Sequence, residues 1–188
     1  MGTHGKRATE VGVDWVVGAA LKARLEKEGL KVVMTKQSQP EVVKNRRRAE
    51  IANEAHADLM IRLHCDASNG SGYTVYYPAK AGTVKGFTGP SEDVMQSSGV
   101  AAKRVLAAMR GVLDGHLHAD PLKTDAQTFI GGKQGGALTG SIFSKVPVVL
   151  VEMVVLTNPK DEAFITSKEG QSLMVEALAK GVLAALGK

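Results

Sequence analysis

Three residues with acid or imidazole side chains stand where the chain could support chemistry. His64 closes a mostly apolar run that begins at residue 58, and Glu152 interrupts an apolar run that begins at residue 147. Glu10 falls in the first turn of a predicted helix. A neutral imidazole can bind a metal or carry a proton. A buried carboxylate is a candidate general base, because burial raises its pKa towards neutrality.

Each of these residues also has a purely structural interpretation. His64 could be a core histidine that bonds to a neighbour, and Glu152 could form an ion pair with Arg48 or Arg62. Glu10 could simply stabilise its helix, because an acidic residue near a helix N-terminus interacts favourably with the helix dipole. Residue type and position alone leave both interpretations open for all three residues.

The order of the predicted elements indicates one α/β domain over residues 1–188. Four segments have apolar residues at helical spacing: 9–28, 41–56, 91–113 and 169–186. Four others have the β-branched or alternating pattern of strands: 30–35, 58–64, 73–77 and 147–153. This alternation predicts a mixed, mostly parallel sheet flanked by helices on both faces. Ligands bind at the carboxyl ends of strands in such sheets, which is where His64 falls.

Two long segments do not show either pattern clearly. Residues 79–90 are rich in Gly and Lys and are expected to form a surface loop. Residues 116–139 are long and Gly-rich, and a loop of that length inside a domain is either functional or contains an unrecognised strand.

Composition limits the class of partner. The net charge of +5 favours an anionic partner such as nucleic acid, a membrane surface or an anionic wall polymer. The aromatic content of 4% argues against a surface that stacks nucleic-acid bases. No apolar stretch reaches the length of a membrane span, and residues 1–7 lack the apolar core of a signal peptide. Cys65 is the single cysteine, and its side chain should point into the core, on the opposite face of the strand from His64.

Two blocks of residues, in this order of elements, resemble one protein family. The first block consists of Arg48, Ile51, Ala52, Asn53, Ala57, Asp58, Leu59 and His64. The second consists of Leu150, Val151, Glu152, Leu156, Thr157, Asn158 and Pro159. From about Gly5 to its end, the chain resembles the zinc-dependent N-acetylmuramoyl-L-alanine amidases of the third amidase family, which are cell-wall hydrolases.

The resemblance implies a function and a set of site residues. In this family two histidines and one glutamate hold a zinc ion, and a second glutamate assists a bound water. Carried over to this chain, the resemblance makes Glu10 and His64 zinc ligands and Glu152 the catalytic glutamate. It implies hydrolysis of the amide between the lactyl group of N-acetylmuramic acid and L-alanine in peptidoglycan. It also implies a periplasmic or extracellular location, with neither a nucleic-acid partner nor insertion into a membrane.

The chain departs from the family pattern in two places. The family's first ligand histidine lies in an Asp-Pro-Gly-His motif at the end of a first strand, and neither precedes Glu10 here. We therefore expect that the chain begins after that strand, through truncation or a misassigned start. Alternatively, His4 takes the place of the missing ligand. Asp66 stands where many relatives have asparagine, and we expect it to accept a hydrogen bond from His64.

Three other functions remain open at this point. A chain with two of three ligands could be a catalytically weak or inactive peptidoglycan-binding module, which would retain wall binding with a zinc stoichiometry near zero. Another zinc amide hydrolase, such as a carboxypeptidase-like enzyme, would need a positive anchor for a free carboxylate, which the sequence does not place. A nucleic-acid binder has only the basic run at residues 44–48 in its favour.

Overall fold

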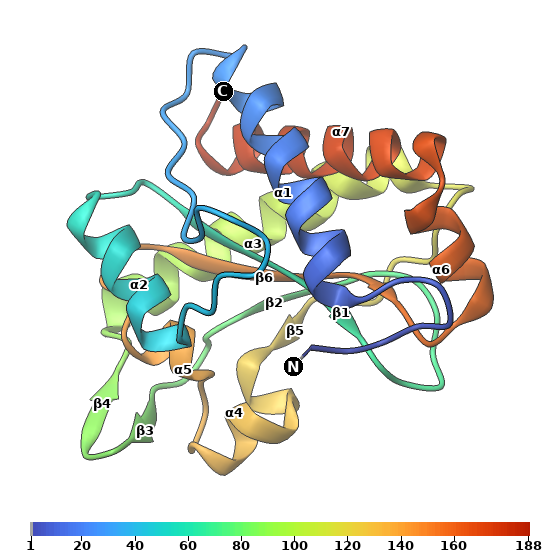
Figure 1. Cartoon of the computed structure of the whole chain (residues 1–188). Coiled ribbons are helices and arrows are strands. Elements are labelled where there is room, and N and C mark those ends of the chain that lie inside the picture. The colour runs from blue at the N-terminus through green and yellow to red at the C-terminus, as the bar shows by residue number, and fades with distance from the viewer. Residues whose placement is uncertain (1) are drawn as a thin grey trace.

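A four-stranded sheet forms the centre of the fold in the computed structural model, which describes residues 2–188 (Figure 1). Its strands, in spatial order, are β1 (Met60–Asp66), β6 (Val148–Val155), β2 (Thr74–Tyr77) and β5 (Lys123–Thr124). Strand β1 is parallel to β6 and β5 is parallel to β2, whereas β2 is antiparallel to β6. The predicted mixed, mostly parallel sheet is confirmed.

Helices cover both faces of this sheet, as predicted. The longer helices are α1 (Glu10–Glu26), α2 (Asn45–Glu54), α3 (Glu92–Leu113), α6 (Pro159–Thr166) and α7 (Lys168–Ala185). The short helices are α4 (Phe129–Lys133) and α5 (Thr139–Ile142). The largest buried apolar cluster joins α1, α3 and α7 to β6, and Figure 1 shows α4 and α5 on the other side of the sheet from α1 and α7. Within residues 2–188, no helix is long and apolar enough to cross a membrane.

Helix α1 follows the sequence pattern closely, and this places Glu10. The side-chain oxygen of Thr9 caps the helix by accepting a hydrogen bond from the Gly12 N–H at 3.2 Å. Val13 and Val17 are buried against the core. Glu10 lies three residues before Val13 and therefore shares the face of α1 that is turned to the sheet.

The strand predicted over residues 30–35 is not formed. A strand is defined by hydrogen bonds to a neighbouring strand, and in the described chain no strand pairs with the outer edge of β1. A cavity of about 180 Å³ lies between β1 and this segment, and its lining includes Val32, Met34, Ile61 and Leu63. One edge of the sheet is therefore unpaired next to His64.

Both long segments without a clear pattern contain secondary structure. Residues 79–90 form a hairpin of β3 (Gly82–Val84) and β4 (Phe87–Gly89), so the expectation of a simple loop is wrong. Residues 116–139 contain β5, a turn of 3₁₀-helix over Asp125–Gln127, and α4. Of the two alternatives for this segment, a functional loop or an unrecognised strand, the structure shows a strand, the two-residue β5.

Candidate metal and catalytic site

His64 and Glu152 are brought together by the pairing of the two central strands. They are Cα partners in the parallel register of β1 and β6, so their side chains share one face of the sheet. Cys65 points the other way and is 3% exposed within the main apolar core, as its position in the strand predicts. The face that carries His64 and Glu152 is thus the polar face of an otherwise apolar pair of strands.

Glu10 reaches the same place from the first turn of α1. Its Oε1 lies 2.8 Å from Nδ1 of His64, and its Oε2 accepts a hydrogen bond from the Thr3 N–H at 2.7 Å. A methyl group on Gly2 would come within 2.4 Å of Oε2, so the chain at Gly2 passes directly over this carboxylate. Both predicted ligand residues, Glu10 and His64, therefore converge, although they are 54 positions apart in the sequence.

Asp14 belongs to the same cluster, and the sequence analysis missed it. One ligand atom from each of Glu10, Asp14 and His64 lies within 4.8 Å of the other two. Asp14 follows Glu10 by four residues, so both carboxylates project from one face of α1. That spacing is the signal in the sequence that could have identified it, once Glu10 was taken as a ligand.

The protonation states of Glu10 and His64 are those required for metal binding. Burial lowers the pKa of His64 by more than the hydrogen bond to Glu10 raises it, which keeps the imidazole neutral. Burial acts to raise the pKa of Glu10, but the hydrogen bonds from His64 and the Thr3 N–H outweigh it and hold this pKa below its usual value. A neutral imidazole and an ionised carboxylate are the forms that bind a divalent cation.

Two further carboxyl groups at the site, those of Asp14 and Glu152, have raised pKa values, in contrast to the lowered pKa of Glu10. Burial, together with the charges of Glu10 and Glu152, raises the pKa of Asp14 to about 8. Burial, together with the charges of Asp66 and Glu10, raises the pKa of Glu152 to about 8. Several carboxylates thus repel one another in a confined space, and a bound cation would relieve that repulsion.

The structural alternative for Glu152 is not supported. None of the ion pairs within the described residues includes Glu152, and its Oε2 is buried without a hydrogen-bond partner there. Arg62 is the one buried arginine or lysine among the described residues, and its charge lowers the pKa of Glu152 by less than burial and the charges of Asp66 and Glu10 raise it. The Arg62 guanidinium is instead packed against Gly140 of α5, where an added methyl group would lie 2.8 Å from Cζ.

Asp66 and His4 lie outside the metal-ligand cluster of the described residues. Asp66 does not bond to His64; its Oδ1 accepts a hydrogen bond from the Ala67 N–H at 2.7 Å, because the strand ends there and turns into a loop. His4 is exposed and forms an isolated bridge with Thr9, and the metal-ligand cluster does not include it.

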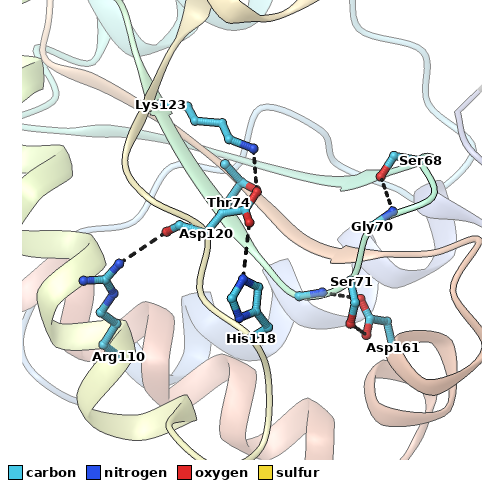
Figure 2. A network of polar contacts seen from close by, with 10 residues as sticks. Ser68, Gly70, Ser71, Thr74, Arg110, His118, Asp120, Lys123 and Asp161 are labelled. Carbon is cyan, nitrogen blue, oxygen red and sulfur yellow. Dashed lines mark hydrogen bonds and ion pairs between the residues drawn. The ribbon is translucent and has the colours of Figure 1, made fainter.

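Buried acids fix the loops around the site (Figure 2). The carboxylate of Asp161, from α6, accepts hydrogen bonds from the Ser71 hydroxyl at 2.8 Å, the Gly72 N–H at 2.6 Å and the Val155 N–H at 3.1 Å. Asn158 caps α6 and donates to the Gly70 carbonyl at 3.0 Å. The block that follows Glu152 in the sequence therefore ties the end of β6 to the loop after β1.

A second polar group ties β2 to the segment that leads into β5. Asp120 accepts hydrogen bonds from the Thr74 hydroxyl at 2.9 Å and from the Lys123 ammonium at 2.5 Å (Figure 2). Thr74 is the Cα partner of Glu152 across the antiparallel pair of β2 and β6. The strand on the far side of Glu152 is thereby anchored at the level of the site.

Comparison with known proteins identifies the family. The sequence profile of the third amidase family, described as N-acetylmuramoyl-L-alanine amidase, matches residues 1–184. The chain belongs to this family. The family resemblance found in the sequence is therefore confirmed over nearly the whole chain.

The sequence identity between this chain and individual members of the family is low. The chain is 26% identical over 180 aligned residues to the N-acetylmuramoyl-L-alanine amidase Rv3717 of Mycobacterium tuberculosis, an alignment that covers 89% of this chain and 65% of the relative. The chain thus spans about two thirds of the length of that curated relative.

Solved structures of the family share the fold. The amidase AmiC2 of Nostoc punctiforme superposes with a TM-score of 0.77 at 22% identity, covering 100% of this chain and 90% of the other. The amidase Ami1 of Mycobacterium smegmatis superposes with a TM-score of 0.79 at 21% identity, covering 99% and 81%. At these identities the likeness establishes the fold of the domain.

Proposed function

We propose that this chain is a zinc-dependent N-acetylmuramoyl-L-alanine amidase. It hydrolyses the amide between the lactyl group of N-acetylmuramic acid and L-alanine in peptidoglycan. Glu10 and His64 hold the zinc ion, and Glu152 is the catalytic glutamate. The observation that carries this proposal is the convergence of an ionised carboxylate at the start of α1, a neutral imidazole near the end of β1, and Glu152 within β6, whose buried Oε2 has no hydrogen-bond partner among the described residues.

The chemistry divides between the metal and Glu152. Zinc, when bound, supplies Lewis acidity that polarises the scissile carbonyl and allows water to lose a proton at about pH 7. Glu152 accepts that proton as the water oxygen bonds to the carbonyl carbon, and then donates it to the nitrogen as the carbon–nitrogen bond breaks. The products are the lactyl carboxylate and a peptide with a free L-alanine amine.

The raised pKa of Glu152 suits a group that first accepts and then donates a proton. With a pKa of about 8, the carboxyl group would hold a proton at neutral pH in the absence of a cation. A divalent cation beside it favours the carboxylate and lowers this pKa, so that the group can accept a proton near pH 7. Its buried Oε2 has no hydrogen-bond partner in the described chain, and accepting the proton therefore breaks no existing bond.

The proposed substrate is consistent with the charge of the chain. The net charge of +5 favours association with an anionic wall polymer. Action on peptidoglycan places the protein in the periplasm or outside the cell. The rival function, a peptidoglycan-binding module with little turnover, draws on one observation: the metal-ligand cluster of the described residues contains a single imidazole.

Digestion of purified peptidoglycan tests the proposal and separates it from its rivals. We expect zinc-loaded protein to release stem peptides that begin with L-alanine, identified by mass spectrometry, and a chelator to stop their release. Release of a C-terminal amino acid instead would identify a carboxypeptidase. Retention on the polymer with no released peptide would identify a binding module.

A further inference from the structure

The sheet face that carries Glu152 continues across two more strands. Thr74 is the Cα partner of Glu152, and Tyr76 follows Thr74 by two residues on β2, so both side chains lie on that face. Tyr76 is in turn the Cα partner of Lys123 on β5. Val75, between the two, is fully buried in the main apolar core on the opposite face. A row of polar side chains therefore runs from Glu152 to the last strand of the sheet.

The Lys123 ammonium is turned back along this row towards Glu152 (Figure 2). Its Nζ lies 2.5 Å from Oδ2 of Asp120, and the same oxygen accepts a hydrogen bond from the Thr74 hydroxyl at 2.9 Å. The ammonium therefore lies beside Thr74, which is one strand away from Glu152. The Lys123 side chain is 32% exposed, so a ligand that lies on this face can contact it.

Lys123 and Tyr76 both have hydrogen-bond donors to offer such a ligand. An ammonium has three N–H donors, and Asp120 is the one hydrogen-bond partner of the Lys123 ammonium among the described residues. Burial raises the pKa of Tyr76, so its hydroxyl keeps its proton at neutral pH. The charges of Lys123 and Glu152 both act on this pKa, which places the hydroxyl near both groups. The end of the row is therefore suited to a group that accepts hydrogen bonds.

The proposed reaction decides which part of the substrate can reach these donors. The proposed metal ligands, Glu10 and His64, lie on the β1 side of Glu152. Glu152 protonates the amide nitrogen in that reaction, so the leaving peptide begins at Glu152. Strands β2 and β5 lie on the side of β6 that is away from β1. The stem peptide is therefore the part of the substrate that can extend over Tyr76 and Lys123.

The spacing of the strands suits the second residue of the stem. Strands β6 and β5 are two strand spacings apart, which is about 10 Å. Two extended residues span at most about 7 Å, and the Lys123 side chain, which reaches back to Thr74, covers the rest. In peptidoglycan the residue after L-alanine is D-glutamate or its amide. The peptide continues through the side chain of this residue, so the α-carboxyl group of D-glutamate is free.

We propose that Lys123, together with the Tyr76 hydroxyl, binds the free carboxylate of the second stem residue. The enzyme then prefers stems that contain D-glutamate over stems in which this carboxyl group is amidated. A carboxylate accepts hydrogen bonds at both oxygens, whereas an amide has one acceptor oxygen and turns an NH₂ donor towards the other donor. The inference rests on the proposed function, and it makes Lys123 a substrate-binding residue outside the metal-ligand cluster.

Hydrolysis of two soluble disaccharide-peptides, with D-glutamate or D-isoglutamine at the second position, tests this inference. We expect the parent protein to have a KM about 10-fold lower for the free acid, because hydrogen bonds to a charged group are the stronger ones. Lys123→Met should remove most of this preference through KM rather than kcat, and Lys123→Arg, which keeps the charge, should retain it. Lys103→Met, an exposed change on α3, is the matched control and should keep the full preference.

Binding of the dipeptides L-alanyl-D-glutamate and L-alanyl-D-isoglutamine, measured by calorimetry, makes the same comparison without turnover. Tyr76→Phe, which removes a single hydroxyl, should reduce the preference in part and keeps the test available should Lys123→Met unfold. Circular dichroism and the thermal midpoint of each variant check the fold.

The outcomes separate the inference from the function on which it rests. If Lys123 only ties β5 to β2, Lys123→Met lowers the thermal midpoint but keeps the ratio of acid to amide KM, and the inference is wrong. A parent protein that digests peptidoglycan without discriminating between the two soluble forms also overturns it. If the parent protein releases no peptide that begins with L-alanine from peptidoglycan, the proposed function itself fails.

Discussion

His64 and Glu152 stand side by side across the parallel pairing of β1 and β6, as Cα partners in adjacent strands. Adjacent strands lie about 4.8 Å apart, so the imidazole and the carboxylate occupy one small area of the sheet. Each has a buried atom, Nε2 and Oε2 respectively, with no partner among the described residues. Two such atoms cost stability, and that cost is expected where residues are retained to bind a ligand.

Glu152→Gln should abolish hydrolysis while leaving zinc content and fold nearly unchanged. The amide has nearly the same shape as the carboxyl group but cannot take a proton from water, and loss of a positioned general base lowers the rate by ~10²–10⁴-fold. Release of stem peptides from peptidoglycan measures the rate, and metal analysis of the purified variant measures the zinc content. Glu54→Gln, an exposed change on α2, is the matched control.

The structural interpretation of Glu152 makes the opposite prediction. If Glu152 served mainly to pair with a buried arginine, its loss would lower the thermal midpoint strongly and reduce activity only through unfolding. Full turnover in a stable Glu152→Gln variant would remove Glu152 from the mechanism altogether.

His64→Ala and Glu10→Ala should each weaken zinc binding more than His4→Ala does. The first two residues contribute ligand atoms to one cluster, whereas His4 is exposed outside it. Zinc titration of the three purified variants compares them directly. Should His4→Ala prove as damaging as His64→Ala, the segment that carries His4 closes over the metal, and His4 is a ligand.

The metal-free protein should lose stability as the pH rises from about 5 to 8. Asp14 and Glu152 have usual pKa values of 3.8 and 4.5 that rise to about 8 in the folded protein. A raised pKa contributes stability below the unfolded value, and this contribution is lost as the pH rises through the folded value. The lowered pKa of His64 acts in the opposite direction, adding stability as the pH rises towards its usual value of 6.5.

Urea unfolding at pH 5, 6.5 and 8, in the presence of a chelator, measures this dependence. A double variant, Asp14→Asn with Glu152→Gln, should lack the loss of stability at high pH because both titrating groups are gone. A parent protein that becomes steadily more stable up to pH 8 would show that these carboxyl groups ionise in the folded state as they do in solution.

The parts of the fold that sequence could predict are those set by periodicity. The apolar spacing of α1 and the apolar run of β6, interrupted only by Glu152, predicted both elements, because local patterns decide which face is buried. The segment 30–35 has an equally good strand pattern but forms no strand, because pairing depends on a neighbour that a local pattern does not report. Residues 123–124 form a strand too short to show any periodicity.

The site was predictable to the extent that its residues interrupt or border apolar runs. Glu10, His64 and Glu152 were found because an acid or a histidine next to an apolar run is unusual. Asp14 lies inside a helix, where an acidic residue is ordinary, and its place in the cluster depends on a partner 50 positions away on β1. Long-range convergence of this kind comes from the packing of α1 on the sheet, which the sequence alone does not specify.

The outer edge of β1 has no paired strand in the described part of the chain. Unpaired backbone groups on a strand edge, next to an apolar cavity, are a site at which another strand can pair. The lining of this cavity contains apolar side chains of β1 and of residues 32–36, and Val33 there is 48% exposed.

We predict that an added N-terminal segment with a strand pattern, ending in a histidine, will pair with β1 and raise both the thermal midpoint and the zinc affinity, because it covers apolar surface and adds a ligand. A matched extension with alternating lysines in the strand is the control. Thermal unfolding, light scattering and zinc titration compare the two extended forms with the 188-residue chain. Equal stability of all three forms, with one zinc ion bound tightly by the unextended chain, would show that the edge is already satisfied and that the unextended chain completes the site by itself.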